Sequence, residues 1–174
     1  TNANKMYLGS RSGGFWRTAD GGKNWLNSTD TLVATGGNTL SASVTNSDSV
    51  IIGLRNANNG YSQGIYYSTN GGLSWLESNF NPTNLGWGGL GRTGKVNVVA
   101  VSPYDSKVVY VASDRGLFKS TDFLKTYSLV KSGNFTAFAY HPTNSSKVYA
   151  YDRNTANRNY IFHSSNGGSS FTRS

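Results

Sequence analysis

The stretch Ser68-Thr69-Asn70-Gly71-Gly72-Leu73-Ser74-Trp75 decides the fold, because its pattern returns three more times along the chain. We call each eight-residue copy an octet. The octets begin at residues 18, 68, 120 and 164. An internal repeat with a period of roughly 50 residues is typical of arrays in which each copy is one small supersecondary unit.

Each octet has the composition of a tight turn that leads into a strand. The hydroxyl at position one and the Asp or Asn at position three can hydrogen-bond to the backbone of the turn. The glycines at positions four and five allow positive φ values, and the aromatic residue at position eight is a large apolar group to bury. The pattern therefore predicts a β-hairpin, with these structural residues: Thr18, Asp20, Gly22, Trp25, Ser68, Asn70, Gly72, Trp75, Ser120, Asp122, Tyr127, Ser164, Asn166, Gly168 and Phe171.

The third octet departs from the pattern. It has Phe123-Leu124 where the other copies have two glycines, and Tyr127 where two of them have tryptophan. Residues other than glycine seldom adopt a positive φ. We therefore expect a turn of another type in this copy.

The pattern S/T-x-D/N-G-G-x-x-W resembles the Asp-box, or BNR, repeat of sialidases, sortilin-type receptors, xyloglucan-active glycoside hydrolases and photosystem II assembly factors. The resemblance rests on all four octets. It implies an all-β fold, a β-propeller of four-stranded antiparallel blades with Asp-box turns. Blades of this architecture have about the length of the repeat.

Alternating apolar residues divide the chain into four blades, at approximately 1–28, 39–78, 95–130 and 134–174, and the first has only three strands. Because a blade buries its faces only against its neighbours, we expect this chain to be a segment of a larger ring of seven or eight blades. Expressed alone, it should self-associate or aggregate. A closed four-bladed ring is the alternative. The aromatic residues that end the octets should lie at equivalent buried positions between successive blades.

One face of such a propeller carries the connections between second and third strands and those between blades, and binding residues usually lie on such loops. One arginine follows the second strand of each blade: Arg11, Arg55, Arg115 and Arg153. Together they would form a ring suited to carboxylates, sulfates or phosphates; solvated loop charges inherited with the repeat are the simpler explanation. Trp87 and Arg92, in a glycine-rich connection, resemble a sugar-binding platform, although a tryptophan buried under its own loop is the simpler explanation.

Composition restricts the partners. The net charge is +8, only 14% of residues are charged, and no cysteine is present. Such a balance is typical of turn-rich extracellular or cell-surface proteins, and the positive charge favours an anionic polysaccharide or an acidic protein surface. The style of the repeats resembles that of large secreted bacterial proteins. Without a basic stripe or an apolar run of about 20 residues, neither nucleic-acid binding nor membrane insertion is expected.

Catalysis is limited by the supply of acidic residues. Glycoside hydrolysis ordinarily requires two carboxyl groups about 5 to 9.5 Å apart. Asp114 and Asp152, on adjacent blades, are weak candidates, because the arginine that follows each favours the ionised carboxylate over a proton-donating acid. The Arg-Ile-Pro motif of sialidases is absent. His141 and His163 lack partners at metal-ligand spacing, and no cofactor or metal motif occurs.

The sequence therefore predicts a non-catalytic recognition or scaffolding module, whose partners are an anionic glycan or a protein and further blades of the same or another chain. Two alternatives stay open. The chain could be part of a xyloglucanase-like or sialidase-like glycoside hydrolase, or an assembly factor that binds a protein.

Overall fold

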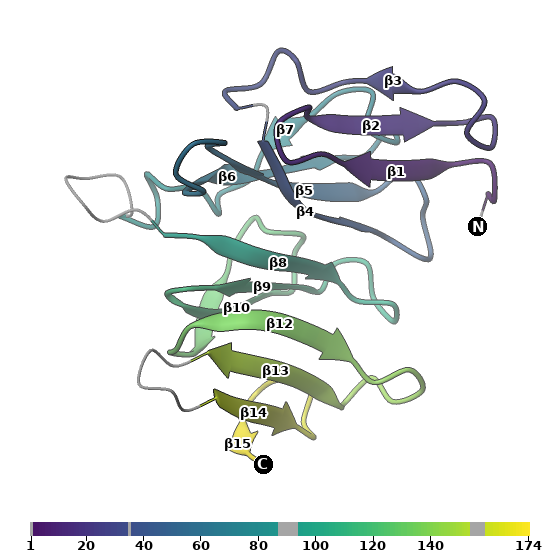
Figure 1. Cartoon of the computed structure of the whole chain (residues 1–174). Helices are drawn as coiled ribbons and strands as arrows, with labels where there is room; N and C mark the ends of the chain where they lie inside the picture. Colours follow the sequence, from purple (N-terminus) through teal and green to yellow (C-terminus); the bar gives the residue numbers. More distant parts are fainter. Residues whose placement is uncertain (1, 35, 87–93, 154–158) are drawn as a thin grey trace.

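The computed structural model describes residues 2–34, 36–86, 94–153 and 159–174, and these form four antiparallel sheets stacked in an arc (Figure 1). We number the sheets as blades 1 to 4. Their strands are β1 (Met6–Gly9), β2 (Phe15–Thr18) and β3 (Leu26–Asn27) in blade 1; β4 (Gly36–Ala42), β5 (Val50–Arg55), β6 (Ser62–Ser68) and β7 (Leu76–Glu77) in blade 2; β8 (Val96–Val101), β9 (Val109–Ser113), β10 (Gly116–Ser120) and β11 (Ser128–Lys131) in blade 3; and β12 (Phe135–Tyr140), β13 (Val148–Arg153), β14 (Asn159–Ser164) and β15 (Thr172–Arg173) in blade 4.

Each blade is a meander, in which strands adjacent in sequence pair antiparallel. The inner strands β4, β8 and β12 lie next to β5, β9 and β13. Blade 1 has no such inner strand among the described residues, so β1 is at the edge of its sheet. This is the predicted propeller architecture, including the missing strand of the first blade. Within the described residues, no helix is long and apolar enough to cross a membrane.

The hydrophobic core lies between the blades. Successive residues of a strand point to opposite faces of its sheet. In β5, Val50 and Ile52 accordingly pack with Phe15 of blade 1, whereas Ile51 packs with Val111 of blade 3. A third cluster joins blades 3 and 4 around Tyr110. Each blade therefore contributes one apolar face to the blade before it and the other to the blade after it.

The octets fold into hairpin turns with a common hydrogen-bond network. In the second octet, the Ser68 hydroxyl donates to Asn70 Oδ1 at 2.8 Å and accepts the Gly72 N–H at 2.8 Å. Asn70 Oδ1 also accepts the Ser74 N–H at 3.0 Å. The same three bonds recur in the other octets. Positions one and three thus close the turn, as their chemistry predicts.

The expectation that the third octet forms another type of turn is wrong. Phe123 and Leu124 have φ values of 61° and 65°, close to the 70° and 79° of Gly71 and Gly72. The Leu124 N–H also donates to Ser120 Oγ at 2.8 Å, as glycine does in the other copies. Two bulky residues therefore hold a left-handed backbone that costs roughly 1–2 kcal/mol each.

Packing against the preceding blade explains why the third octet tolerates these residues. The Leu124 side chain is 1% exposed and belongs to the same apolar cluster as Ile51 of blade 2. The Phe123 ring contacts the Tyr67 ring edge-on, with centroids 5.6 Å apart. Burial of two apolar side chains between blades therefore offsets the backbone strain.

The second and fourth octets, which contain glycine, face larger neighbours in the preceding blade, and these leave no room for a side chain. A Cβ atom placed on Gly72 would lie 2.9 Å from Phe15 Cε1, and one on Gly168 would lie 1.7 Å from Tyr110 Oη. Residue size at the second glycine position is thus complementary to the strand residues of the preceding blade.

In three of four cases the aromatic residues that end the octets lie between successive blades, where they are half-buried rather than fully buried as predicted. Trp75 packs on Phe15 with ring centroids 4.8 Å apart, Tyr127 packs on Phe80 at the same distance, and Phe171 lies partly buried beside the cluster of blades 3 and 4. The prediction is wrong for Trp25, which is 40% exposed. Within the described chain, no blade precedes blade 1 to cover it.

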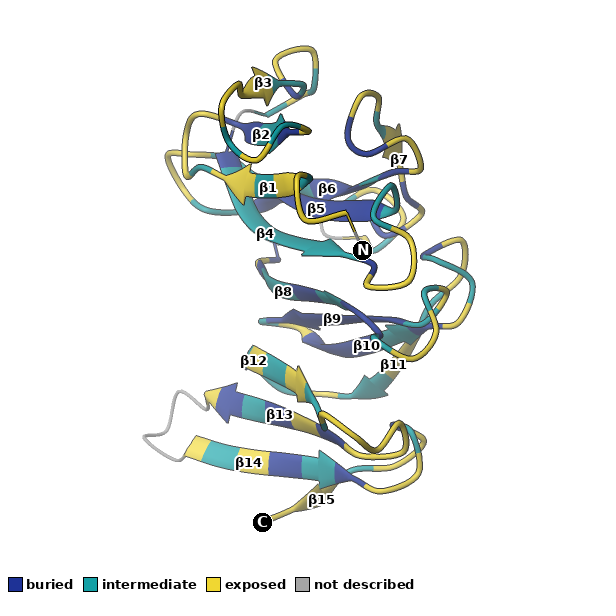
Figure 2. Ribbon diagram, turned by 90° about the vertical axis from the view of Figure 1, so that its right-hand side faces the viewer, coloured by how far each residue is buried: buried dark blue, intermediate teal, exposed yellow. Residues whose placement is uncertain are grey.

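Blades 1 and 4 lie at opposite ends of the arc in both views (Figures 1 and 2). The alternative of a closed four-bladed ring is therefore wrong. Exposed residues are prominent on β1 of blade 1 and on β14 of blade 4 (Figure 2).

Candidate functional site

The connections between second and third strands, and those between blades, lie on the side of the arc opposite the octet turns. We call this side the loop face. The four predicted arginines all lie there: Arg11 follows β1, Arg55 ends β5, Arg115 joins β9 to β10, and Arg153 ends β13. Trp87 and Arg92 lie outside the described residues.

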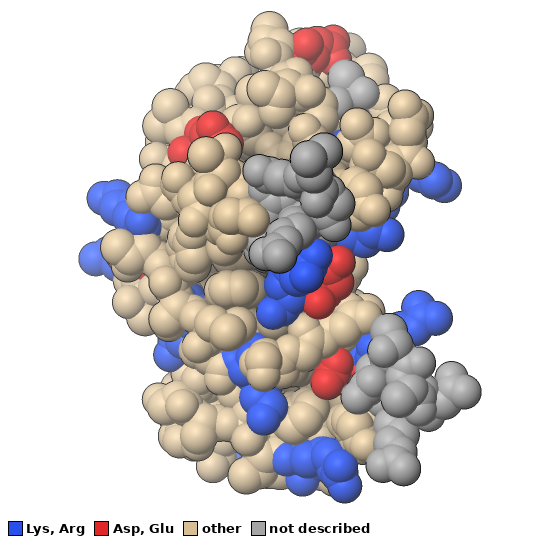
Figure 3. Space-filling view, turned by 90° about the vertical axis from the view of Figure 1, so that its left-hand side faces the viewer, with Lys and Arg blue, Asp and Glu red and all other residues tan. Residues whose placement is uncertain are grey.

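The charges on the loop face are dispersed. Lys and Arg side chains occupy several separate places on this face, with acidic side chains among them (Figure 3). Arg115 Nε lies 3.9 Å from Asp114 Oδ1, so this arginine is partly neutralised by its own neighbour. Arg115 and Arg153 are exposed, whereas Arg55 is half-buried. The four arginines are thus not equivalent, and Arg55 has the most enclosed surroundings.

Asp114 and Asp152 have the same structural role in adjacent blades. Asp114 Oδ1 accepts the backbone N–H of Lys95 at 2.8 Å, and Asp152 Oδ1 accepts that of Asn134 at 2.8 Å. Each carboxylate thereby anchors the segment that enters the inner strand of its own blade. Asp152 is only 8% exposed. Both weak catalytic candidates are therefore engaged in holding the backbone.

The side chain of Arg55 lines a hollow of about 300 Å³ on the loop face. The hollow lies between the connection from blade 1 to blade 2 and the β5–β6 loop, and its polar side chains come from Arg55, Asn56, Asn58 and Gln63. Arg55 Nε is buried and has no hydrogen-bond partner among the described residues. A buried donor without a partner is uncommon in folded proteins, and a ligand can satisfy it.

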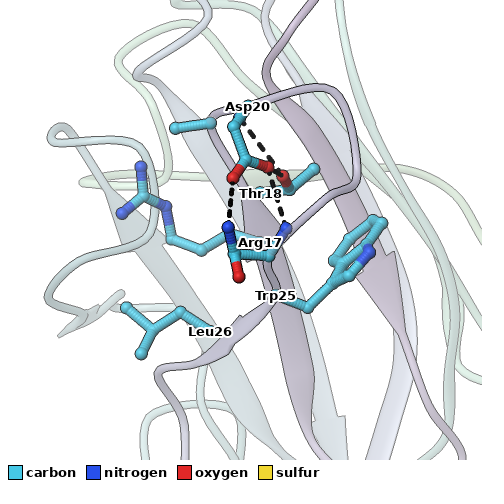
Figure 4. Close-up of a pocket in the computed structure, with 7 residues that line it drawn as sticks. Arg17, Thr18, Asp20, Trp25 and Leu26 are labelled. Carbon is cyan, nitrogen blue, oxygen red and sulfur yellow. Dashed lines mark hydrogen bonds between the residues drawn. The ribbon is translucent and has the colours of Figure 1, made fainter.

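A second hollow, of about 360 Å³, lies beside the first octet (Figure 4). Sequence reasoning singled out three of its residues, Thr18, Asp20 and Trp25, but not Arg17. The Asp20 carboxylate accepts hydrogen bonds from the Asn24 N–H, the Asn24 side-chain amide and the Thr18 hydroxyl, which together lower its pKa to about 2. Arg17 and Trp25 extend in opposite directions from the hairpin (Figure 4). The acid of this hollow is thus committed to its turn.

Within the described residues, no group of three or more His, Cys, Asp or Glu side chains could hold a metal ion. His163 instead lies on blade 4, where its Nδ1 is 3.0 Å from Ser174 Oγ and its Nε2 is 3.1 Å from Thr172 Oγ1. Arg17 Nε, like Arg55 Nε, is buried without a hydrogen-bond partner among the described residues. Because Asp20 in the hollow of Arg17 is committed to its turn, we take the loop-face hollow beside Arg55 as the candidate binding site.

Comparison with known proteins identifies the architecture. No family model matches the chain, and no curated protein matches it. Among solved structures, the GH74 xyloglucanase from Xanthomonas campestris superimposes with a TM-score of 0.71 at 18% identity, over 98% of this chain and 28% of that chain. The Niastella koreensis GH74 enzyme gives 0.70 at 22% identity, over 98% and 28%.

A different protein, YCF48 bound to D1 peptide, superimposes with a TM-score of 0.64 at 14% identity, over 98% of this chain and 51% of that chain. The chain thus spans between about a quarter and about half of these solved structures. Identities this low establish the fold alone. The two kinds of neighbour share it, and so does the present chain, which is an all-β propeller segment built from four antiparallel blades.

Proposed function

We propose that this chain is a non-catalytic recognition module of a secreted or cell-surface protein, in which an Asp-box propeller presents a binding site for anionic polysaccharide on its loop face. The observation that carries the proposal is the side chain of Arg55, which lines the hollow between blades 1 and 2 and whose buried Nε has no hydrogen-bond partner among the described residues. A uronic acid carboxylate or a sulfate matches the planar fork of a guanidinium group.

The other polar groups of the hollow suit the neutral part of a sugar. The side-chain amides of Asn56, Asn58 and Gln63 supply both hydrogen-bond donors and acceptors, which sugar hydroxyl groups require. Leu32 and Ala34 add apolar surface at the opposite side of the hollow. The net charge of +8 favours an acidic polymer over a neutral one.

Engagement of the two candidate acids supports a non-catalytic role. A general acid must donate its proton to the substrate, but Asp114 and Asp152 each accept a backbone N–H of their own blade. The alternatives are a hydrolase segment and a protein-binding assembly factor. Release of reducing sugar from xyloglucan that is abolished by Asp114→Asn would support the hydrolase and contradict the proposal.

The test is affinity electrophoresis of the chain in gels that contain polygalacturonate, heparin or neutral xyloglucan. Retention should be specific to the acidic polymers and should decrease as salt rises, because the screening length falls from about 10 Å at 0.1 M to about 3 Å at 1 M. Arg55→Lys keeps the charge but removes Nε. It should weaken binding about tenfold or more, since a hydrogen bond to a charged group contributes about 1.5–3 kcal/mol.

Arg115→Lys is the matched control, because Arg115 lies on the same face but is exposed and paired with Asp114. It should change binding little. Equal retention by acidic and neutral polymers, or equal loss in the two lysine variants, would refute the site at Arg55.

A further inference from the structure

The two ends of the arc carry the same kind of surface that the blades bury against one another inside the chain. We call the face of a blade toward its predecessor the trailing face, and the face toward its successor the leading face. The trailing face of blade 1 and the leading face of blade 4 have no partner within the described residues (Figure 2).

The strand registers show that Leu8, an exposed residue of blade 1, occupies the position that core residues occupy in the other three blades. Leu8 pairs with Trp16 as Ile52 pairs with Tyr66, Val111 with Phe118 and Ala150 with Phe162. Ile52, Val111 and Ala150 are at most 2% exposed, but Leu8 is 54% exposed. The trailing face of blade 1 is therefore a core face without its cover.

The same holds for the leading face of blade 4. Ile161 corresponds in register to Ile65 and Leu117, which are fully buried, yet Ile161 is 54% exposed. Tyr149 corresponds to Tyr110, with 39% exposure against 1%. Around Ile161 and Tyr149 the face forms an apolar hollow of about 210 Å³.

Contacts inside the chain define what fits on such a leading face. Tyr110 and Lys119 of blade 3 both donate to the Gly167 carbonyl in the octet turn of blade 4, at 2.8 and 2.6 Å. Blade 2 presents the smaller Ile51 at the position of Tyr110, and the octet turn that it meets contains Leu124 in place of glycine. A tyrosine on the leading face of one blade thus faces a glycine in the octet turn of the next blade, and an isoleucine faces a leucine.

Blade 4 presents Tyr149 at the position of Tyr110 and His163 at the position of Lys119, so it requires a glycine turn. Blade 1 offers one in Gly21-Gly22, on its uncovered side. We propose that the leading face of blade 4 binds the trailing face of blade 1 in a second copy of this chain, head to tail. This pairing is independent of the loop-face site.

The pairing makes specific contacts. The Gly21-Gly22 turn of one copy lies against Tyr149 and His163 of the other, and the Tyr149 hydroxyl donates to one of its carbonyl groups. Trp25 covers Ile161, just as Trp75 covers Phe15 inside the chain with ring centroids 4.8 Å apart. The exposed tryptophan of the first octet thereby gains the burial that the other octets already have.

Sedimentation velocity over a dilution series tests the association. The chain should form species of twice the chain mass or larger, and Ile161→Asp should return it to single chains. Leu76→Asp is the matched control, because Leu76 is 60% exposed on the outer strand β7, away from both end faces. It should leave association unchanged. Single chains throughout, or association that persists in Ile161→Asp, would overturn the proposal.

Two further variants test direction and fit. The chain has no cysteine, so a mixture of Trp25→Cys and Ile161→Cys chains should form a mixed disulfide, while neither variant alone should cross-link. Gly22→Leu should block association, because the leucine would clash with Tyr149 of the other copy. Adding Tyr149→Ile should restore association, because it recreates the pair of Leu124 and Ile51 between blades 2 and 3. Cross-linking of either single variant with itself, or no rescue by Tyr149→Ile in a chain that melts cooperatively, would refute head-to-tail pairing.

Discussion

The two adjacent glycines of the fourth octet allow two reasons for a glycine in the turn to be distinguished, namely backbone conformation and lack of space for a side chain. Gly167 and Gly168 both have left-handed backbones, with φ values of 65° and 80°. A Cβ atom on Gly167 would meet no atom within 4 Å, whereas one on Gly168 would lie 1.7 Å from Tyr110 Oη and 2.7 Å from its Cζ. Gly167→Ala therefore introduces backbone strain alone, and Gly168→Ala adds a clash with a fully buried ring.

These geometries set different magnitudes. Gly167→Ala should lower the free energy of unfolding by about 1–2 kcal/mol, the cost of a left-handed non-glycine residue. Gly168→Ala carries the same cost, a further 1–3 kcal/mol for overpacking, and about 1 kcal/mol for the displaced hydrogen bond from Tyr110 to Gly167, or about 3–6 kcal/mol in all. Equilibrium urea unfolding, with m compared between variants, measures both values.

A double variant completes the test. Gly168→Leu combined with Tyr110→Ile recreates the pair of Leu124 and Ile51 and should be more stable than the sum of the two single changes predicts, by about 1–3 kcal/mol. Equal destabilisation by Gly167→Ala and Gly168→Ala, or strict additivity in the double variant, would show that backbone conformation alone selects glycine and would refute complementarity between blades.

Three other predictions concern the turns and the blade contacts. Hydrogen bonds lower the pKa of Asp20 to about 2 and also lower the pKa of Asp122. The stability that these carboxylates contribute is therefore complete above the usual pKa of 3.8 and is lost as pH falls through the pKa of the folded state. Between these pH values the melting temperature should drop less in the double variant Asp20→Asn, Asp122→Asn than in the unmodified chain. Leu124→Ala should cost about 2–5 kcal/mol in urea unfolding, because the side chain is 1% exposed, and a loss below about 1 kcal/mol would contradict its role in offsetting strain. Tyr7→Phe removes the 2.6 Å hydrogen bond to the Ser47 carbonyl and should cost about 1 kcal/mol by the same assay, whereas no loss would mean that water replaces the contact.

Much of the fold follows from the octets because their chemistry is local. The bonds from Ser68 and Asn70 to the turn close within eight residues, so the sequence predicts them without knowledge of the rest of the chain. Strand alternation likewise predicts antiparallel blades, since residues of period two form two apolar faces. The arginines of the loop face follow from the same repeat.

The features that sequence reasoning missed depend on what another blade places opposite a residue. Phe123 and Leu124 looked incompatible with a glycine turn, and only the apolar surface of blade 2 explains them. In sequence, Trp25 is equivalent to the aromatic residues that end the other three octets. It is more exposed than they are because it lies at the uncovered end of the arc.

Local sequence thus determined the hairpin turns of the three octets that contain glycine, the strand pattern and the number of blades. The tertiary structure decided which acids are engaged, that the buried Nε atoms of Arg17 and Arg55 lack a hydrogen-bond partner among the described residues, and which apolar faces remain open. Asp114 and Asp152 accept N–H groups from segments about twenty residues before them, and Arg55 lines a hollow between two blades. The physical reason is that a turn satisfies its own hydrogen bonds, whereas burial and pairing between blades are set by residues distant in the chain.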